Sequence, residues 1–319
     1  MIYLGVFIVL LGLELLYFRI ADYFGIIDRP NDRSSHTNVT LRGGGVIFYV
    51  AVVIYFLVSN FQYPGFFIGL TMLTIISFLD DILTLSNKIR LAVHFFAVLL
   101  VIYQLDLFAM HWFYLALTFV ITVGVINAYN FMDGINGITA CYSLAVSSVL
   151  IVINESINFI DQDLLIYTML SILVFAFFNF RISAKCFAGD VGSVAIAYIL
   201  VFAIGALILK TGSLIYLLLL CVYGVDVVWT ILRRLYLREN IFKAHRSHLY
   251  QYLANEAGVN KLFVSFAYGV AQLIIGVAVI NVSQQDMITQ IIFTLLLLTI
   301  LSVVYLVTKT WVIRTYVRL

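Results

Sequence analysis

Residues 187–210 read FAGDVGSVAIAYILVFAIGALILK. The run from 194 to 210 is apolar until Lys210, and its length of about 17 residues suits a helix that crosses a membrane. Immediately before this run, Asp190 stands between glycines in a short polar cluster. Polar clusters at the ends of apolar segments recur along the chain. We therefore expect the chemistry of the protein to lie in these clusters.

The overall composition indicates a membrane protein. Of the 319 residues, 64% are hydrophobic and 11% are charged, and the mean hydropathy is +1.09. A chain of this kind cannot hide its apolar surface in a water-soluble fold. Because backbone groups in lipid must be satisfied within their own segment, we predict an all-α integral membrane protein. Its expected transmembrane helices, about eleven, lie at residues 2–20, 44–60, 65–80, 90–105, 112–130, 138–154, 164–181, 194–210, 214–232, 262–281 and 288–308.

The distribution of Lys and Arg predicts the orientation, because these residues stay on the cytoplasmic side during insertion. With a periplasmic N-terminus and a cytoplasmic C-terminus, every Lys and Arg except Lys210 falls on the cytoplasmic side. The sequence contains no long linker, internal repeat or low-complexity tract. We expect one polytopic domain over residues 1–319.

The first cytoplasmic cluster spans residues 28–36, DRPNDRSSH, and ends with Arg42 and the glycines at 43–45. Successive glycines allow the backbone to approach a ligand closely, so Arg42 and Gly44 are candidate substrate-binding residues. The alternative is a basic loop that rests on anionic lipid headgroups.

A second cluster holds the adjacent carboxylates Asp80 and Asp81, followed by Lys88 and Arg90. Two neighbouring carboxylates at a membrane boundary need a cation, a partner or water. A divalent metal or a phosphate-binding set would meet that need, and Lys88 is a candidate for contacting substrate. The alternative is a helix end stopped by interfacial charge.

Residues 127–137, NAYNFMDGING, form the third cluster. Asn127, Asn130 and Asp133 lie on one face by helical spacing, and their oxygens are the ligands that Mg²⁺ accepts. Asp190 opens the eighth segment, where amides at a helix N-terminus can receive phosphate oxygens. Ordinary turn chemistry is the alternative explanation for the glycines beside Asp190.

The last cluster is the loop with His245, Arg246 and His248. Its two imidazoles lie one turn apart if the loop is helical, and with Arg246 they suit hydrogen bonding to a diphosphate or a sugar. A metal site with two histidines is a weaker alternative, because no Cys or Glu is spaced as a zinc ligand.

These clusters, in this order, resemble the polyprenyl-phosphate N-acetylhexosamine-1-phosphate transferases (glycosyltransferase family 4), which are related to phospho-N-acetylmuramoyl-pentapeptide transferase. The resemblance covers nearly the whole chain. It implies transfer of a sugar 1-phosphate from a UDP-N-acetylhexosamine to undecaprenyl phosphate, with release of UMP and with Mg²⁺ or Mn²⁺ as cofactor. It also implies a multi-pass protein of the bacterial cytoplasmic (inner) membrane whose active site faces the cytoplasm.

The resemblance also suggests roles for single residues. Asp190 is similar to a metal ligand, with Asn130 as a second oxygen ligand, and Asn136 is similar to a position that contacts uracil. Asp80 and Asp81 resemble a pair near the lipid phosphate. Asp133 belongs to the same catalytic network, and the remaining candidates for binding substrate are Asn127, Lys185, His245, Arg246 and His248.

Two features differ within the family. Relatives often carry a charged residue where this chain has Thr84, which leaves the role of that position open. Relatives that use muramoyl-pentapeptide have consecutive histidines, whereas residues 245–248 read HRSH, as in the branch that initiates O-antigen. We therefore expect the synthesis of O-antigen, part of the lipopolysaccharide of the cell envelope. UDP-GlcNAc, UDP-FucNAc and UDP-QuiNAc are the candidate donors.

The alternative from another class is a membrane transporter, in which polar residues would line a path through broken helices at mid-bilayer. Here the clusters lie on one side, which favours the enzyme. A homodimer is compatible with this interpretation, contact with membrane lipid is expected, and no nucleic-acid partner is expected.

Overall fold

The computed structural model describes residues 1–30, 38–83, 85–240 and 245–317. Most of the first cytoplasmic cluster, from residue 31 to 36, lies outside these residues, as does Thr84. The described helices are α1 (Ile2–Tyr23), α2 (Val46–Val58), α3 (Pro64–Leu83), α4 (Asn87–Gln104), α5 (Trp112–Met132), α6 (Ile138–Ile157), α7 (Gln162–Asn179), α8 (Gly189–Thr211), α9 (Cys221–Tyr236), α10 (Leu249–Gln251), α11 (Lys261–Val282) and α12 (Met287–Tyr316). Shorter elements are β1 (Ile27–Asp28), β2 (Thr40–Leu41), the 3₁₀ turns η1 (Leu107–Ala109) and η2 (Leu214–Leu220), and the π-turn η3 (Tyr252–Glu256).

Each of the eleven expected segments is helical, so the prediction of an all-α membrane protein is confirmed. Nine helices of the described chain are long and apolar enough to cross a membrane, with η2 and α9 forming one of them. The helix α2 is apolar but shorter, and α4 is not among the nine. The count of eleven crossings and the periplasmic position of the N-terminus stay predictions.

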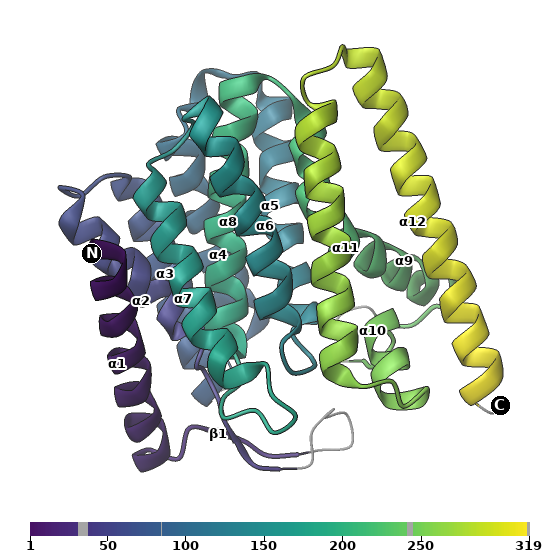
Figure 1. Cartoon of the computed structure of the whole chain (residues 1–319), viewed down its shortest axis with the longest axis horizontal. Helices are drawn as coiled ribbons and strands as arrows, with labels where there is room; N and C mark the ends of the chain where they lie inside the picture. Colours follow the sequence, from purple (N-terminus) through teal and green to yellow (C-terminus); the bar gives the residue numbers. More distant parts are fainter. Residues whose placement is uncertain (31–37, 84, 241–244, 318–319) are drawn as a thin grey trace.

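The helices surround α8. In its most apolar stretch 83% of the residues are buried, against 6% for α12, so α8 forms the centre of the bundle and α12 its edge (Figure 1). The helices α2, α3, α5 and α6 all contact α8. Figure 1 places the β1–β2 hairpin, α10 and the C-terminus at the same end of the bundle.

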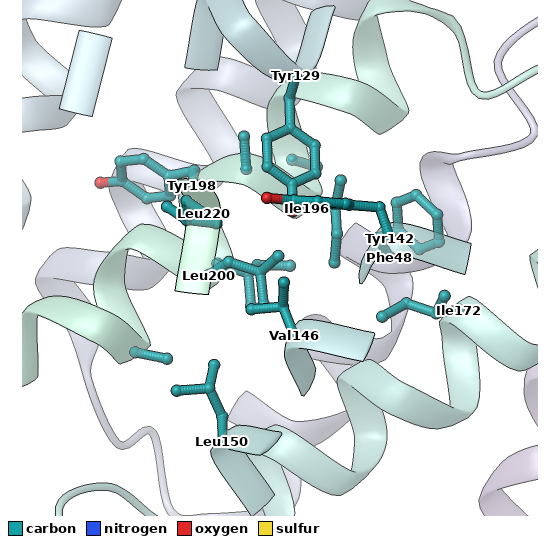
Figure 2. Packing of buried hydrophobic residues seen from close by; sticks show 14 of the residues in the cluster. Phe48, Tyr129, Tyr142, Val146, Leu150, Ile172, Ile196, Tyr198, Leu200 and Leu220 are labelled. Carbon is teal, nitrogen blue, oxygen red and sulfur yellow. The ribbon is translucent and has the colours of Figure 1, made fainter. Parts of the chain in front are cut away.

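Large side chains fill the space around α8, as Figure 2 shows. The rings of Tyr142 (α6) and Tyr223 (α9) stack with their centroids 3.6 Å apart. Tyr198 of α8 is fully buried and donates its hydroxyl hydrogen to the Ala97 carbonyl of α4 at 2.7 Å. Such hydrogen bonds allow aromatic residues with a polar group to be buried without an unpaired donor.

Glycine contacts bring the first and third quarters of the chain together. The segment after β2 runs beside residues 186–188, with the Gly44 amide donating to the Phe187 carbonyl at 2.8 Å. A Cβ on Gly45 would collide with the backbone of Gly192 in α8. Only glycine allows two backbones to approach so closely. The glycines at 43–45, expected to approach a ligand, thus approach the protein's own chain and position the start of α8.

Candidate active site

The carboxylates of the second cluster meet Asp190 and two arginines where β2, α3, α4 and α8 converge. One Arg42 nitrogen lies 2.7 Å from Asp81 and 3.7 Å from Asp190. Arg90 lies 2.8 Å from Asp80 and 3.5 Å from Asp190. The structure thus brings Asp80, Asp81 and Asp190, three of the candidate site residues named from the sequence, into one group. Arg90, which we had not included among the candidates, belongs to the same group.

Asp81 caps the N-terminus of α8. Its two carboxylate oxygens accept hydrogen bonds from the amides of Asp190 and Val191, both at 3.1 Å. A carboxylate at this position satisfies amides that have no partner within the helix and interacts favourably with the helix dipole. We expected these amides to receive phosphate oxygens, but in this structure two of them are already occupied.

Gly189 makes this cap possible. Its φ of +71° is in the left-handed region that favours glycine, and a Cβ there would lie 2.6 Å from an Asp81 carboxylate oxygen. Tyr17 of α1 helps to hold Arg42 in place, because its hydroxyl donates to the Arg42 carbonyl at 2.6 Å. The glycine before Asp190 is therefore needed for packing against Asp81, in addition to any role of this segment in chemistry.

Asp133 lies at the end of α5, close enough to Asp81 and Asp190 for their charges to affect it. Thr139 donates to the Asp133 carboxyl at 2.6 Å. Burial raises the pKa of Asp133 to about 7; the Thr139 hydrogen bond acts to lower it, and the charges of Asp190 and Asp81 add to the increase. A carboxyl held in this way can carry or release a proton near neutral pH.

The asparagines of the third cluster differ in what their side chains do. Asn127 donates to the Val123 carbonyl of its own helix at 2.8 Å. The Asn130 side-chain nitrogen is buried and has no hydrogen-bond partner among the described residues. Asn136 donates to the carbonyls of Arg181 and Ile182, at 2.7 and 3.2 Å. A uracil could therefore meet only the side-chain oxygen of Asn136.

The histidine loop packs on the end of α5. The ring centroids of His245 and His248 lie 5.1 Å apart, and both rings lie beside Phe131. His245 shares a hydrogen bond of 2.9 Å with Ser247. Burial is the main cause that lowers the pKa of His245 to about 4, so its ring is neutral at pH 7. The third and last clusters thus form one surface.

Tyr250 joins the same two clusters. Its hydroxyl donates to the Phe131 carbonyl at 2.9 Å, and a Cβ on Gly134 would collide with it. Arg246 forms an ion pair of 3.6 Å with Glu256. The side chains of Lys88 and Lys185 are exposed, and no contact of either side chain with the carboxylate group was found in the described structure.

The donor set suits a hard divalent cation only in part. Within the described residues no three acidic, His or Cys side chains are close enough to form a complete metal site. Mg²⁺ commonly takes one or two carboxylates and completes its shell with substrate phosphates and water. Asp190, whose side chain is 22% exposed, fits that role, and Asn130 is the second oxygen ligand of the predicted set. The residues present are therefore compatible with an ion that arrives with its substrate.

Comparison with known proteins gives the same family that the motifs indicated. Residues 63–209 match Glycosyl transferase family 4. A probable undecaprenyl-phosphate N-acetylglucosaminyl 1-phosphate transferase of Bacillus subtilis (strain 168) is 25% identical over 256 residues, 74% of this chain and 71% of that protein.

Two further relatives support the match. An undecaprenyl-phosphate alpha-N-acetylglucosaminyl 1-phosphate transferase of Thermotoga maritima is 28% identical, over 76% of this chain and 78% of that protein. A phospho-N-acetylmuramoyl-pentapeptide-transferase of Petrotoga mobilis is 26% identical, over 63% of this chain and 70% of that protein. With the carboxylate group and the histidine loop at one end of a helical membrane bundle, these comparisons show that the chain is similar to glycosyl transferase family 4 over residues 63–209 and to phospho-N-acetylhexosamine transferase enzymes over most of its length.

Proposed function

We propose that the protein transfers an N-acetylhexosamine 1-phosphate from a UDP-N-acetylhexosamine to undecaprenyl phosphate and releases UMP. The observation that carries the proposal is the meeting of Arg42 and Arg90 on Asp190, beside Asp133. Two guanidinium groups that are about one third exposed can turn their remaining donors to a diphosphate. The match of residues 63–209 to Glycosyl transferase family 4 favours this function over the transporter alternative.

The reaction needs charge neutralisation and alignment more than a covalent intermediate. An oxygen of the lipid phosphate attacks the β-phosphorus of the UDP-sugar, and the bond from that phosphorus to the bridging oxygen breaks as UMP leaves. A phosphate monoester has a second pKa of about 6, so the lipid phosphate is already ionised near pH 7 and requires no strong base. Holding the two reacting groups in line is then the main task of the protein.

Each side chain has a proposed part in that task. Arg42 and Arg90 bind phosphate oxygens and are themselves held by Asp81 and Asp80. Asp80 and Asp81 place this pair of arginines near the lipid phosphate. Mg²⁺ or Mn²⁺, bound by Asp190 and Asn130, would neutralise negative charge on the diphosphate.

The donor side of the site is assigned to the clusters around α5 and the histidine loop. Asn127, Asn136, His245, Arg246 and His248 are proposed to contact the nucleotide sugar, and the exposed Lys88 and Lys185 add positive charge near the entrance. Neutral His245 can accept or donate one hydrogen bond without repelling the arginines.

The finer assignment concerns the sugar and the pathway. The HRSH sequence at 245–248 supports UDP-GlcNAc or a 6-deoxy relative, UDP-FucNAc or UDP-QuiNAc, as donor. The product would begin a lipid-linked surface polysaccharide such as O-antigen. In this proposal the protein is a multi-pass protein of the bacterial inner membrane, with the site at its cytoplasmic face.

The test is UMP release by purified protein with undecaprenyl phosphate and Mg²⁺, for UDP-GlcNAc, UDP-GalNAc, UDP-FucNAc and UDP-QuiNAc. We expect release that requires the lipid and stops with chelator. Asp286→Asn, which changes an exposed acidic residue before α12, serves as a control that should retain activity. If a folded preparation released no UMP from any donor, the proposed reaction would be wrong; release from UDP-GalNAc alone would correct the sugar.

A further inference from the structure

A buried carboxylate in α9 lies directly behind the histidine loop. Asp226 is 2% exposed, and one of its oxygens lies 3.1 Å from His248 Nδ1 and accepts the Leu249 amide at 3.1 Å. Tyr268 of α11 donates to the other oxygen at 2.8 Å. Thr230 donates to the first oxygen at 3.3 Å. Four groups of the described structure thus surround this buried carboxylate.

The position of the proton on His248 follows from these contacts. A carboxylate that already accepts an amide and a tyrosine hydroxyl is ionised, so it can only accept from Nδ1. In the cap of α10 the backbone amide of Gln251 also donates to the His248 side chain. That contact would require an imidazole nitrogen without a proton. An ionised oxygen at 3.1 Å is the stronger partner. We therefore assign the proton to Nδ1.

A cation, Lys309, also belongs to this buried network. Lys309 of α12 is 4% exposed and donates to Thr230 at 3.2 Å and to Tyr305. Thr230 in turn contacts Asp226 at 3.3 Å. The ammonium of Lys309 therefore balances the charge of the Asp226 carboxylate through Thr230.

The other ring nitrogen of His248 has no protein partner. Nε2 is buried and makes no hydrogen bond within the described residues. The His248 ring lies between those of Phe131 and Tyr250, at centroid distances of 6.3 and 5.9 Å, beside the cluster that ends α5. Other buried side-chain atoms of the described structure also lack a partner, but this nitrogen lies beside the third cluster, where a bound ligand would satisfy it.

We propose that Asp226 is a positioning residue: it holds the proton of His248 on Nδ1, so that Nε2 accepts a hydrogen bond from an N–H or hydroxyl of the bound nucleotide sugar. This inference rests on the proposed function for the identity of the ligand. Asp226 and Lys309 act only through His248 and do not touch the substrate. Carboxylates that orient a functional histidine in this way commonly change activity 10- to 100-fold when they are removed.

A double-mutant cycle tests the link between the two side chains. Asp226→Ala should lower kcat/KM for the donor about 100-fold, whereas Asp226→Asn, which keeps an oxygen facing Nδ1, should lose less than about 10-fold. In a His248→Ala background, Asp226→Ala should cause no further loss. Multiplicative losses in the double variant would show that Asp226 acts independently of His248 and would overturn the proposal.

The tautomer is measured on the wild-type protein, which removes the risk that Asp226→Ala fails to fold. In protein labelled with ¹⁵N-histidine, the resonances of His248 are identified by their loss in His248→Ala. We expect a protonated Nδ1, a bare Nε2, and a shift of Nε2 on addition of UDP-GlcNAc. A protonated Nε2 would refute the assignment even if the enzyme is active. Failure of every donor in the UMP assay, with a bare Nε2, would instead refute the proposed function.

Discussion

Two regions of the protein neutralise carboxylates, and they do so in different surroundings. Around Asp81 and Asp190 the cations are arginines that are about one third exposed and reach two carboxylates each. Around Asp226 the cation is Lys309, the contacts pass through Thr230, and every member is buried. The first region can exchange partners when a ligand arrives, whereas the second cannot.

The difference follows from solvent access. Arg42, Arg90 and Asp190 are partly exposed, so their ion pairs gain little net free energy and can be replaced by water or phosphate at small cost, whereas Asp81 is buried and is held by the α8 amides. A buried carboxylate is stable only while its partners remain, and removal of one partner costs about 3 to 5 kcal/mol. Changes in the exposed group should therefore affect turnover, and changes in the buried network should affect stability.

The largest expected effect is on turnover, from Asp190→Asn. Loss of the charge removes the proposed metal ligand, and we expect kcat to fall about 10³-fold, which corresponds to roughly 4 kcal/mol. The melting temperature in detergent should stay unchanged, because the Asp190 ion pairs are long and partly exposed. Full activity would remove Asp190 from the site, and a large loss of stability would abolish the contrast between the two regions.

Lys309→Met should produce the matching effect on stability. Asp226 would remain buried without its balancing cation, and we expect a loss of about 3 kcal/mol in the free energy of unfolding. Lys210→Met is the control, because Lys210 is exposed at the end of α8 and should contribute about 0.5 kcal/mol. Equal stability of the two variants would show that the buried network needs no cation.

Arg42→Lys sharpens the comparison within the exposed group. Lysine keeps the charge but cannot reach Asp81 and Asp190 with a planar fork of donors. We expect kcat/KM for the donor to fall about 10- to 30-fold, mostly through KM, with little change in stability. Unchanged steady-state kinetics would mean that Arg42 holds the fold and does not bind phosphate.

The smallest effect concerns pH. Because burial lowers the pKa of His245 to about 4, the unfolded chain binds a proton between pH 6.5 and 4 that the folded protein does not. The contribution of His245 to the free energy of unfolding is therefore fully present above pH 6.5 and is lost as the pH falls from 6.5 through 4. The loss is about 1 kcal/mol for a partly screened ring. His245→Gln should show a flatter dependence in chemical unfolding at pH 4.5 and 7. A parallel dependence in both proteins would contradict the neutral state of His245.

Hydropathy predicted the helices well because an apolar run in lipid has few other stable structures. The polar clusters predicted that Asp80, Asp81 and Asp190 belong to one site, since all three lie at the expected cytoplasmic ends of membrane segments. Which group each carboxylate serves could not be predicted. That Asp81 caps α8 depends on a contact across 109 positions of sequence.

Asp226 escaped the sequence analysis for a physical reason. It stands inside the expected segment at 214–232 with apolar neighbours, and no local pattern separates a paired carboxylate from an isolated one. Lys309 was counted only as an interfacial charge, although it is buried. The signal that could have found both is the high cost of a charge within an apolar helix, which requires a partner elsewhere.

The sparse packing of α12 has a mechanical consequence. The fully buried residues of the helix are Tyr305, Lys309 and Val312, all within its C-terminal half. Residues 287–308 form an apolar length of roughly 33 Å, close to a hydrocarbon thickness of about 30 Å. Its N-terminal half is held more loosely, by partly buried residues such as Phe293 and Leu297 and by the hydrogen bond from Ser213 to Gln290 at 2.7 Å, so the thickness of the bilayer also influences its tilt. In thinner membranes we expect α12 to tilt more, about its buried contacts near Lys309, which lie beside the histidine loop.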